Sequence, residues 1–192
     1  MGREAMEAAV AAFLEAAGAD LSDPQLAETP RRVAEAWAEE LLAGQGVEAA
    51  TLLEGFAPPA GEGAVVVTGL RYVGVCPHHL LPYQGTAHLA YLPGERAVGF
   101  SKLARLVQTL GARLVLQEQL AQDLCGALSG PLGAQGAAAV LEGSHACMTL
   151  RGVRQAEATV TCTAYSGAYA GADSPHRRAL DDAIRAWRST HP

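Results

Sequence analysis

The spacing of hydrophobic residues changes near Gly63, and this change limits the possible folds more than any other feature of the chain. Before it, apolar residues share two helical stripes: Met6, Val10, Phe13 and Leu14, then Val33, Trp37 and Leu41. Thr29-Pro30 precedes the second stripe as an expected N-cap and first helical residue, and Gly44 ends it. A loop rich in proline and glycine follows over residues 55–63.

After this loop the chain shows mainly strand patterns. They cover residues 64–75, 87–92, 137–141, 146–151 and 157–164. One helical pattern begins at Ser101 as N-cap, a second contains Leu120, Leu124 and Leu128, and a third follows Asp173-Ser174-Pro175. This order predicts an α+β fold, with an N-terminal helical region over 1–54 and a second region over 64–192.

The composition excludes several classes of protein. Of the 192 residues, 49% are hydrophobic and the net charge is only -6, so most of the chain is expected to be ordered. This negative charge also argues against a general nucleic-acid-binding protein, which needs a broad basic face. No apolar run approaches the roughly 20 residues of a membrane-spanning helix, and the N-terminus does not resemble a signal peptide. We therefore expect a cytoplasmic protein with reduced cysteines.

The segment Cys76-Pro77-His78-His79 places a thiol and an imidazole three positions apart. Cys76 and His79 can bind one zinc ion from a single turn, because thiolate and imidazole are ligands that zinc prefers. His78, between them, is expected to point elsewhere. The alternative is a cysteine at a strand end followed by two histidines in a polar turn.

A second segment, residues 144–151, places polar residues at alternate positions. Read as a strand, it presents His145, Cys147, Thr149 and Arg151 on one face and apolar residues on the other. A face with histidine, cysteine and arginine together predicts the wall of a site. Cys76, His79 and Cys147 would leave a fourth zinc position for water, as in catalytic zinc sites, whereas Cys125 and Cys162 are interpreted as core residues.

Two further segments contain charged residues at helix starts. Lys102, the only lysine of the chain, and Arg105 lie one turn apart, where a helix N-terminus favours an anion. An ordinary solvated helix face is the alternative. Gln117-Glu118 begins the next helix, where an acid is also favoured by the helix dipole alone.

Taken together and in this order, these four segments resemble the GTP cyclohydrolase I family. The family motifs are Cys-Glu-His-His-Leu-Leu-Pro, Gly-Leu-Ser-Lys-Leu-Ala-Arg, Gln-Glu-Arg-Leu and His-x-Cys-Met-x-x-Arg-Gly, and they correspond to residues 76–82, 99–105, 117–120 and 145–152. Residues 28–34 match the start of the family's N-terminal helix. The resemblance covers nearly the whole chain.

The resemblance implies the T-fold, an antiparallel sheet with helices on one face, for residues 64–192. It implies that sheets of neighbouring subunits join into a barrel within a toroidal homodecamer that has its sites at subunit interfaces. The implied reaction is hydrolysis of GTP to 7,8-dihydroneopterin triphosphate and formate, the first step of tetrahydrofolate or pterin biosynthesis.

The resemblance also implies roles for individual residues. Cys76, His79 and Cys147 would hold Zn2+, whose water attacks C8 of guanine. His145 and His78 would move protons, and Glu118 would accept hydrogen bonds from guanine. The other implied site residues line the base pocket (Gln117, Val98 and Leu116) or hold the triphosphate (Ser101, Lys102, Arg105, Arg151 and, from an adjacent subunit, Arg32).

The chain departs from the family pattern at four positions. Pro77 replaces a glutamate, Gly74 a serine and Gly69 an aspartate, and Glu35 stands where some relatives carry a lysine. Two other hypotheses therefore accompany the cyclohydrolase: a divergent enzyme acting on another purine nucleotide or yielding another product, and a non-catalytic T-fold oligomer that binds a purine or pterin. His78 and His145 argue against the last, since a binding protein needs no proton carriers.

Overall fold

The computed structural model describes residues 2–56 and 63–191, so most of the expected loop over 55–63 lies outside the described residues. Contacts between residues divide the chain into two compact units, Met1–Ala43 and Gly44–Pro192. No helix within the described ranges combines the length and apolar character needed to cross a membrane.

The N-terminal unit is helical and ends at Ala43, whereas the expected helical region extends to residue 54. It contains α1 (Arg3–Ala16), α2 (Thr29–Ala36) and a π-helical turn, η1 (Trp37–Leu41). Thr29 is the first residue of α2 and Glu28 takes the cap position, so the expected N-cap is displaced by one residue. Arg3 on α1 forms an ion pair with Glu39 at 3.3 Å.

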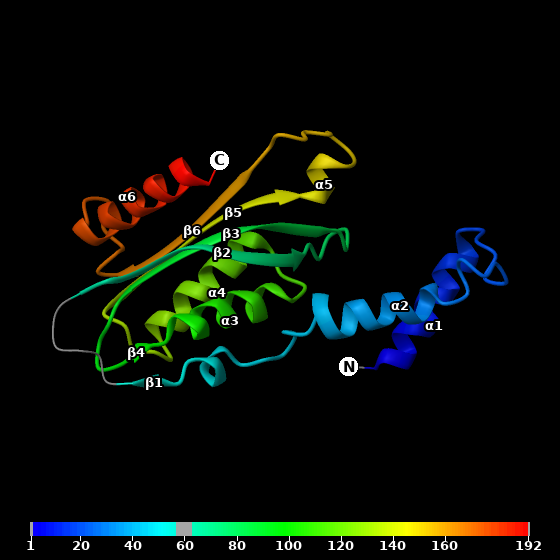
Figure 1. Ribbon diagram of the computed structural model, residues 1–192, viewed down its shortest axis with the longest axis horizontal. Coiled ribbons are helices and arrows are strands. Elements are labelled where there is room, and N and C mark those ends of the chain that lie inside the picture. Colours follow the sequence, from blue (N-terminus) through cyan, green and yellow to red (C-terminus); the bar gives the residue numbers. More distant parts are fainter. Residues whose placement is uncertain (1, 57–62, 192) are drawn as a thin grey trace. The chain divides into compact units, whose positions relative to one another are not determined.

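The larger unit is built on a four-stranded antiparallel sheet in the order β2-β3-β5-β6 (Figure 1). Its strands are β2 (Val65–Val75), β3 (Pro82–Leu92), β5 (Gly136–His145) and β6 (Val160–Gly167). The short strands β1 (Gly55–Phe56) and β4 (Ala97–Val98) pair separately, and η2 (Ala49–Leu52) is a 3-10 turn. The α+β class with an antiparallel sheet is confirmed.

Helices cover both faces of this sheet, whereas the resemblance implies one (Figure 1). On one face α3 (Phe100–Gly111) and α4 (Gln117–Ser129) pack on the odd-numbered side chains of β3 and β5 to form the main core. On the other face Leu180 and Ile184 of α6 (Pro175–Thr190) pack on Ala90, Ala138 and Val140. Because successive side chains of a strand point to opposite faces, the sheet contributes side chains to one core on each face.

The helix patterns after residue 100 are mostly confirmed. Leu120, Leu124 and Leu128 are fully buried on α4. Ser174 caps α6, since its hydroxyl accepts a hydrogen bond from the Arg177 backbone N–H at 3.3 Å. The prediction for Ser101 is wrong: Gly99 takes the extended cap position of α3 and Ser101 lies in its first turn.

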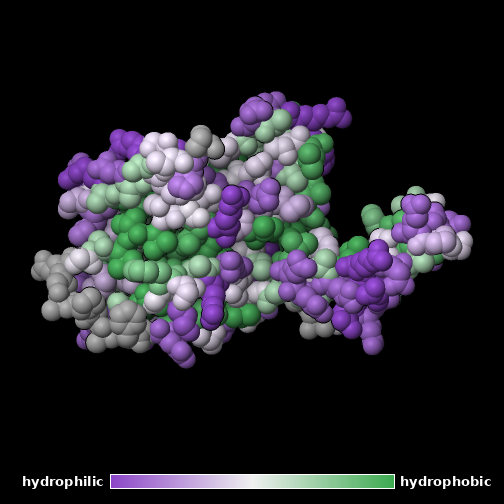
Figure 2. Space-filling view, in the orientation of Figure 1, coloured by the Kyte–Doolittle hydropathy of each residue, from purple (hydrophilic) through white to green (hydrophobic). Residues whose placement is uncertain are grey.

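Hydrophobic residues also reach the surface of the larger unit. Figure 2 shows them gathered across the middle of the face turned to the viewer. Exposed hydrophobic side chains of this unit include Val73 on β2, Leu114 and Leu116, each at least 37% exposed. Apart from an isolated bridge between Val75 and Leu114, β2 pairs only with β3 among the described strands, so most of this edge of the sheet is open.

Candidate metal centre and its surroundings

A tight turn at the end of β2 brings Cys76 and His79 together. Cys76 is buried and follows the last residue of β2 directly. Its carbonyl accepts a hydrogen bond from the Leu80 N–H at 2.9 Å, and its own N–H donates to Leu81 O at 3.0 Å. Leu80 adopts a φ of 54°, an unfavourable value for a leucine, which marks the turn as a constrained segment.

Cys147 approaches this turn from a helical turn and not from a strand. β5 ends at His145, and α5 (Ala146–Thr149) follows, so the predicted strand over 146–151 is wrong. His145 lies opposite Tyr83, one residue from Pro82, where β3 begins. The pairing of β3 with β5 ends at that pair, since the next residue of β3 is Pro82, which has no backbone N–H to donate. The chain then closes a helical turn in which Leu150 N–H donates to Ala146 O.

The three predicted metal ligands converge despite this correction. The ligand atoms of Cys76, His79 and Cys147 all lie within 4.8 Å of one another. His78 is outside this group, and its ring stands nearly perpendicular to that of His79 with centroids 6.4 Å apart. Cys125 and Cys162 are buried core residues, as predicted, and burial raises the pKa of both thiols. Two thiols and one imidazole suit a zinc ion.

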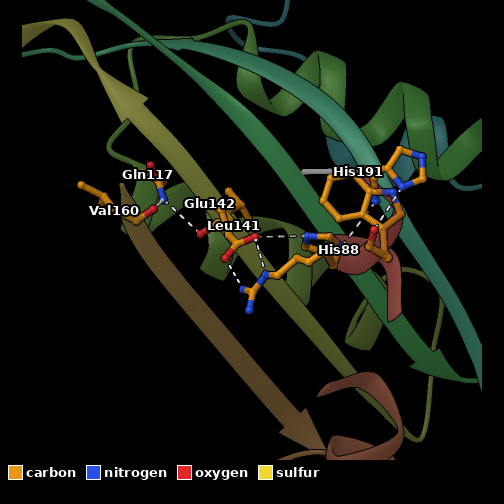
Figure 3. A network of polar contacts seen from close by, with 9 residues as sticks. His88, Gln117, Leu141, Glu142, Val160 and His191 are labelled. Carbon is orange, nitrogen blue, oxygen red and sulfur yellow. Dashed lines mark hydrogen bonds and ion pairs between the residues drawn. The ribbon is translucent and has the colours of Figure 1, made fainter. Parts of the chain in front are cut away.

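His145 is held by Gln117, which is only 1% exposed. The Gln117 side-chain N–H2 donates to the carbonyls of Leu141 (3.2 Å) and Val160 (2.9 Å), as Figure 3 shows. Its Oε1 must therefore be the acceptor in the 2.7 Å contact with His145 Nε2. A neutral His145 thus carries its proton on Nε2, which leaves Nδ1 as the acceptor.

Electrostatics at His145 act in two directions. Burial lowers the pKa of His145, whereas the nearby Glu118 carboxylate raises it. Glu118 is exposed in the first turn of α4, next to Leu116 at its cap position. Arg151 is also exposed, four residues after Cys147. The described structure thus gathers the metal ligands, His145, Gln117, Glu118 and Leu116 at one end of the sheet.

Tyr83 completes the surroundings of His145, and sequence reasoning missed it. Its ring stacks on the imidazole with centroids 4.7 Å apart and an interplanar angle of 5°. Its hydroxyl donates to Val115 O at 2.8 Å. Only the strand register reveals this contact, since Tyr83 and His145 are 62 positions apart in the chain.

A second group of predicted site residues lies at the opposite end of the sheet. The Val98 N–H donates to the Tyr91 hydroxyl at 3.1 Å, and Ser101 and Lys102 follow in the first turn of α3. Tyr91 is eight residues from Tyr83 along β3, about 27 Å in an extended strand. A single chain therefore does not bring Val98, Ser101 and Lys102 to the metal ligands.

The cations of this second group remain accessible. Lys102 forms an ion pair with the strongly exposed Glu54 at 3.6 Å, and Arg105 is exposed one turn further along α3. Arg32 is exposed in the N-terminal unit. Glu35, one of the departures from the family pattern, is used locally and binds Arg31 at 2.7 Å.

Comparison with known proteins identifies the family. The sequence profile described as GTP cyclohydrolase I matches residues 6–184. The chain belongs to the GTP cyclohydrolase I family. This match spans both units, the converging cysteine–histidine–cysteine group and the second group on α3.

Relatives in this family agree over most of their length. The chain is 42% identical over 171 residues to GTP cyclohydrolase 1 of Leifsonia xyli, covering 88% of each chain. It is 39% identical to GTP cyclohydrolase 1 of Rhodopirellula baltica, covering 85% of this chain and 71% of the relative. For the Clostridium perfringens protein of the same name the identity is 36%, covering 87% of this chain and 90% of the relative.

Proposed function

We propose that this protein hydrolyses GTP to 7,8-dihydroneopterin triphosphate and formate, the first step of pterin or tetrahydrofolate biosynthesis. The observation that carries the proposal is the convergence of Cys76, His79 and Cys147 beside a held histidine, in a chain of the GTP cyclohydrolase I family. A cysteine–histidine–cysteine set with an exposed histidine leaves room for a water ligand and substrate.

Cys76, His79 and Cys147 would hold Zn2+. When bound, zinc supplies a Lewis acid that makes water an effective nucleophile near neutral pH, here toward C8 of guanine. Two free thiols in the ligand set suit a reducing compartment, so a cytoplasmic location is part of the proposal.

The residues around the ligands divide the remaining tasks. Glu118, exposed and close enough to His145 to affect its pKa, would accept hydrogen bonds from the guanine N1–H and exocyclic amine. His145, with Nδ1 left as acceptor by Gln117, would carry a proton to and from the imidazole ring of the base, and His78 would serve near the ribose. Leu116, Val98 and Gln117 would surround the base.

The triphosphate would be bound by Ser101, Lys102, Arg105 and Arg151, with Arg32 from an adjacent subunit. Since Lys102 and Val98 lie at the other end of the sheet from Cys76, one complete site requires residues of two chains. The open edge at β2, with Val73 exposed, supports a homo-oligomer in which sheets join edge to edge. We propose the homodecamer of the family, with sites at subunit interfaces.

The direct test is incubation of the purified protein with GTP, with formate and the pterin chromophore measured separately. Both products are expected in equal amounts. Formate without the pterin would indicate a divergent cyclohydrolase that stops earlier, and turnover of another purine nucleotide alone would indicate a different substrate. GTP binding without either product would support the non-catalytic alternative.

The two-chain site has its own test. Lys102→Ala and Cys147→Ala chains, each of low activity, are unfolded, mixed in equal amounts and refolded together. Random assembly leaves about one quarter of sites with both intact residues when these come from different chains. Recovery of activity supports the interface site, and no recovery contradicts it.

A further inference from the structure

One row across three strands aligns Gly74, Tyr83 and His145. Gly74 on β2 lies directly opposite Tyr83 on β3, and Tyr83 lies directly opposite His145 at the end of β5. Opposite residues in an antiparallel pair project to the same face, so these three positions share the face covered by α3 and α4. The order in the row places the tyrosine between a glycine and the histidine.

The absence of a side chain at Gly74 is what makes room for the Tyr83 ring. A Cβ at position 74 would lie 2.4 Å from Cζ and 2.5 Å from the hydroxyl oxygen of Tyr83. Contacts this short are not tolerated, so the ring would have to move from any residue larger than glycine. Gly74 on β2 thus leaves the space that the Tyr83 ring occupies.

Three contacts determine the position of the Tyr83 ring in this space. Tyr83 is 1% exposed, and its hydroxyl donates to Val115 O at 2.8 Å, at the segment leading into α4. Tyr72 contacts it edge-on with centroids 6.0 Å apart. The remaining face stacks on His145 at 4.7 Å and 5°. A ring fixed on its other sides offers the imidazole a rigid flat surface.

Gln117 and Tyr83 restrain different motions of the same imidazole. The hydrogen bond from His145 Nε2 to Gln117 sets one ring atom at 2.7 Å but permits rotation about that bond. Stacking on Tyr83 sets the plane of the ring. Together they leave one orientation for Nδ1, which a proton carrier needs.

We propose that Tyr83 is a positioning residue that holds His145 in the orientation required for proton transfer, with Gly74 as the position that admits it. This inference rests on the proposed function for the role of His145. The placement itself does not, and it can be measured without substrate.

Substitutions at Tyr83 separate the ring from the hydroxyl. Tyr83→Phe retains the stacking ring and loses the bond to Val115, so kcat should stay within about twofold while the melting temperature falls. Tyr83→Leu loses the flat surface, so kcat should fall by about 10-fold to 100-fold while KM for GTP and zinc content stay unchanged. Gly74→Ala, which displaces the ring from the other side, should lower kcat in the same way.

Tyr169→Leu is the matched control. Tyr169 is also a fully buried tyrosine beside a histidine, His176, at a centroid distance of 5.6 Å, but it belongs to the core under α6. Tyr169→Leu should lower the melting temperature, as Tyr83→Leu does, but it should leave kcat unchanged when kcat is measured well below both melting temperatures. Equal kcat values for the Tyr83→Leu and Tyr169→Leu variants would overturn the proposal.

A magnetic resonance measurement tests the placement without activity. In protein labelled with ¹³C on its six histidine rings, His145→Gln assigns the His145 signal. This signal should be shifted by the stacked ring in the wild type and in Tyr83→Phe, and should lose that shift in Tyr83→Leu and Gly74→Ala. A His145 signal that is the same in all four proteins would overturn the proposal. A Gly74→Ala protein in which this signal has moved but kcat equals that of the wild type would also overturn it. If wild-type protein forms no product from GTP, the proposed function fails, but the signal still decides whether Tyr83 positions His145.

Discussion

His88, which is fully buried, lies with its Nε2 3.6 Å from a carboxylate oxygen of Glu142 on the neighbouring strand. Figure 3 shows this contact. Arg188 of α6 binds the same carboxylate. The His88 ring also meets Trp187 edge-on at 5.0 Å, and its Nδ1 accepts from the Gly69 N–H at 3.4 Å. The C-terminal helix is thus attached to the sheet through a buried histidine.

This arrangement predicts that acid destabilises the protein. Burial lowers the pKa of His88, Arg188 acts in the same direction, and Glu142 opposes them. In the unfolded chain the pKa of histidine is about 6.5. Below that pH the unfolded state therefore binds more protons than the folded state, and the free energy of unfolding decreases. Stability should therefore be complete above about pH 6.5 and fall as the pH decreases toward 5.

Urea unfolding at pH 7.5 and pH 5.5 measures this effect, and His88→Asn should reduce the difference between the two free energies. His145 contributes in the same direction because its pKa is also lowered by burial. His145→Gln is therefore the control, and it should retain the part of the pH-dependent difference in unfolding free energy that is due to His88. An unchanged pH dependence in His88→Asn would contradict the assignment.

Gly69 is predicted to be intolerant of any side chain, for two separable reasons. Its φ is 82°, and a Cβ there would lie 2.6 Å from Trp187 Nε1. Gly133→Ala is the matched control, because Gly133 has a φ of 71° but no atom within 4 Å of its added Cβ. Gly133→Ala should cost about 1 kcal/mol of unfolding free energy, and Gly69→Ala about 1–3 kcal/mol more. Equal losses would show that Trp187 moves aside freely.

Removal of one proposed ligand should abolish metal binding. We expect about one zinc per chain in the wild type and almost none in Cys147→Ala, since two remaining ligands hold zinc weakly. Cys125→Ala removes a thiol from the core and should retain full zinc content. Metal analysis after dialysis checks both, and full zinc in Cys147→Ala would refute the ligand assignment.

Glu118→Gln should strongly reduce kcat/KM for GTP, by about 100-fold or more, because an amide cannot accept from both guanine donors. Asp123→Asn provides the control, as Asp123 lies on the same helix and its carboxylate already accepts from Gln119 at 2.7 Å. Steady-state formate release measures both variants. Near-normal kcat/KM in Glu118→Gln would leave Glu118 as an ordinary acid at a helix start.

Lys102→Ala should raise KM for GTP, flatten its dependence on salt and leave zinc content unchanged, because the ammonium group would bind phosphate. Guanosine, which lacks phosphate, should be affected far less. Arg185→Ala removes a surface cation that is paired with Asp182, and it should not change KM. Equal losses on GTP and guanosine would contradict the phosphate role.

The sequence alone determined the features that depend on neighbours along the chain. The turn that joins Cys76 to His79 and the start of α6 at Ser174-Pro175 were predicted from residues within a few positions of one another. The buried stripe of α4, which includes Leu124, follows from helical spacing. Such patterns report local backbone geometry and periodic burial, which is why they suffice for element type.

Tertiary structure decided what depends on the pairing of distant segments. The alternation after His145 predicted a strand, but the pairing of β3 with β5 ends at Tyr83, so Cys147 reaches the ligands from a helical turn. The stacking of Tyr83 on His145 also follows from strand register. The position of Lys102 at the far end of the sheet follows from the contact of Val98 with Tyr91 just before α3. Register is set by the fit of side chains tens of residues apart, such as the space at Gly74 for Tyr83, and no local pattern encodes it.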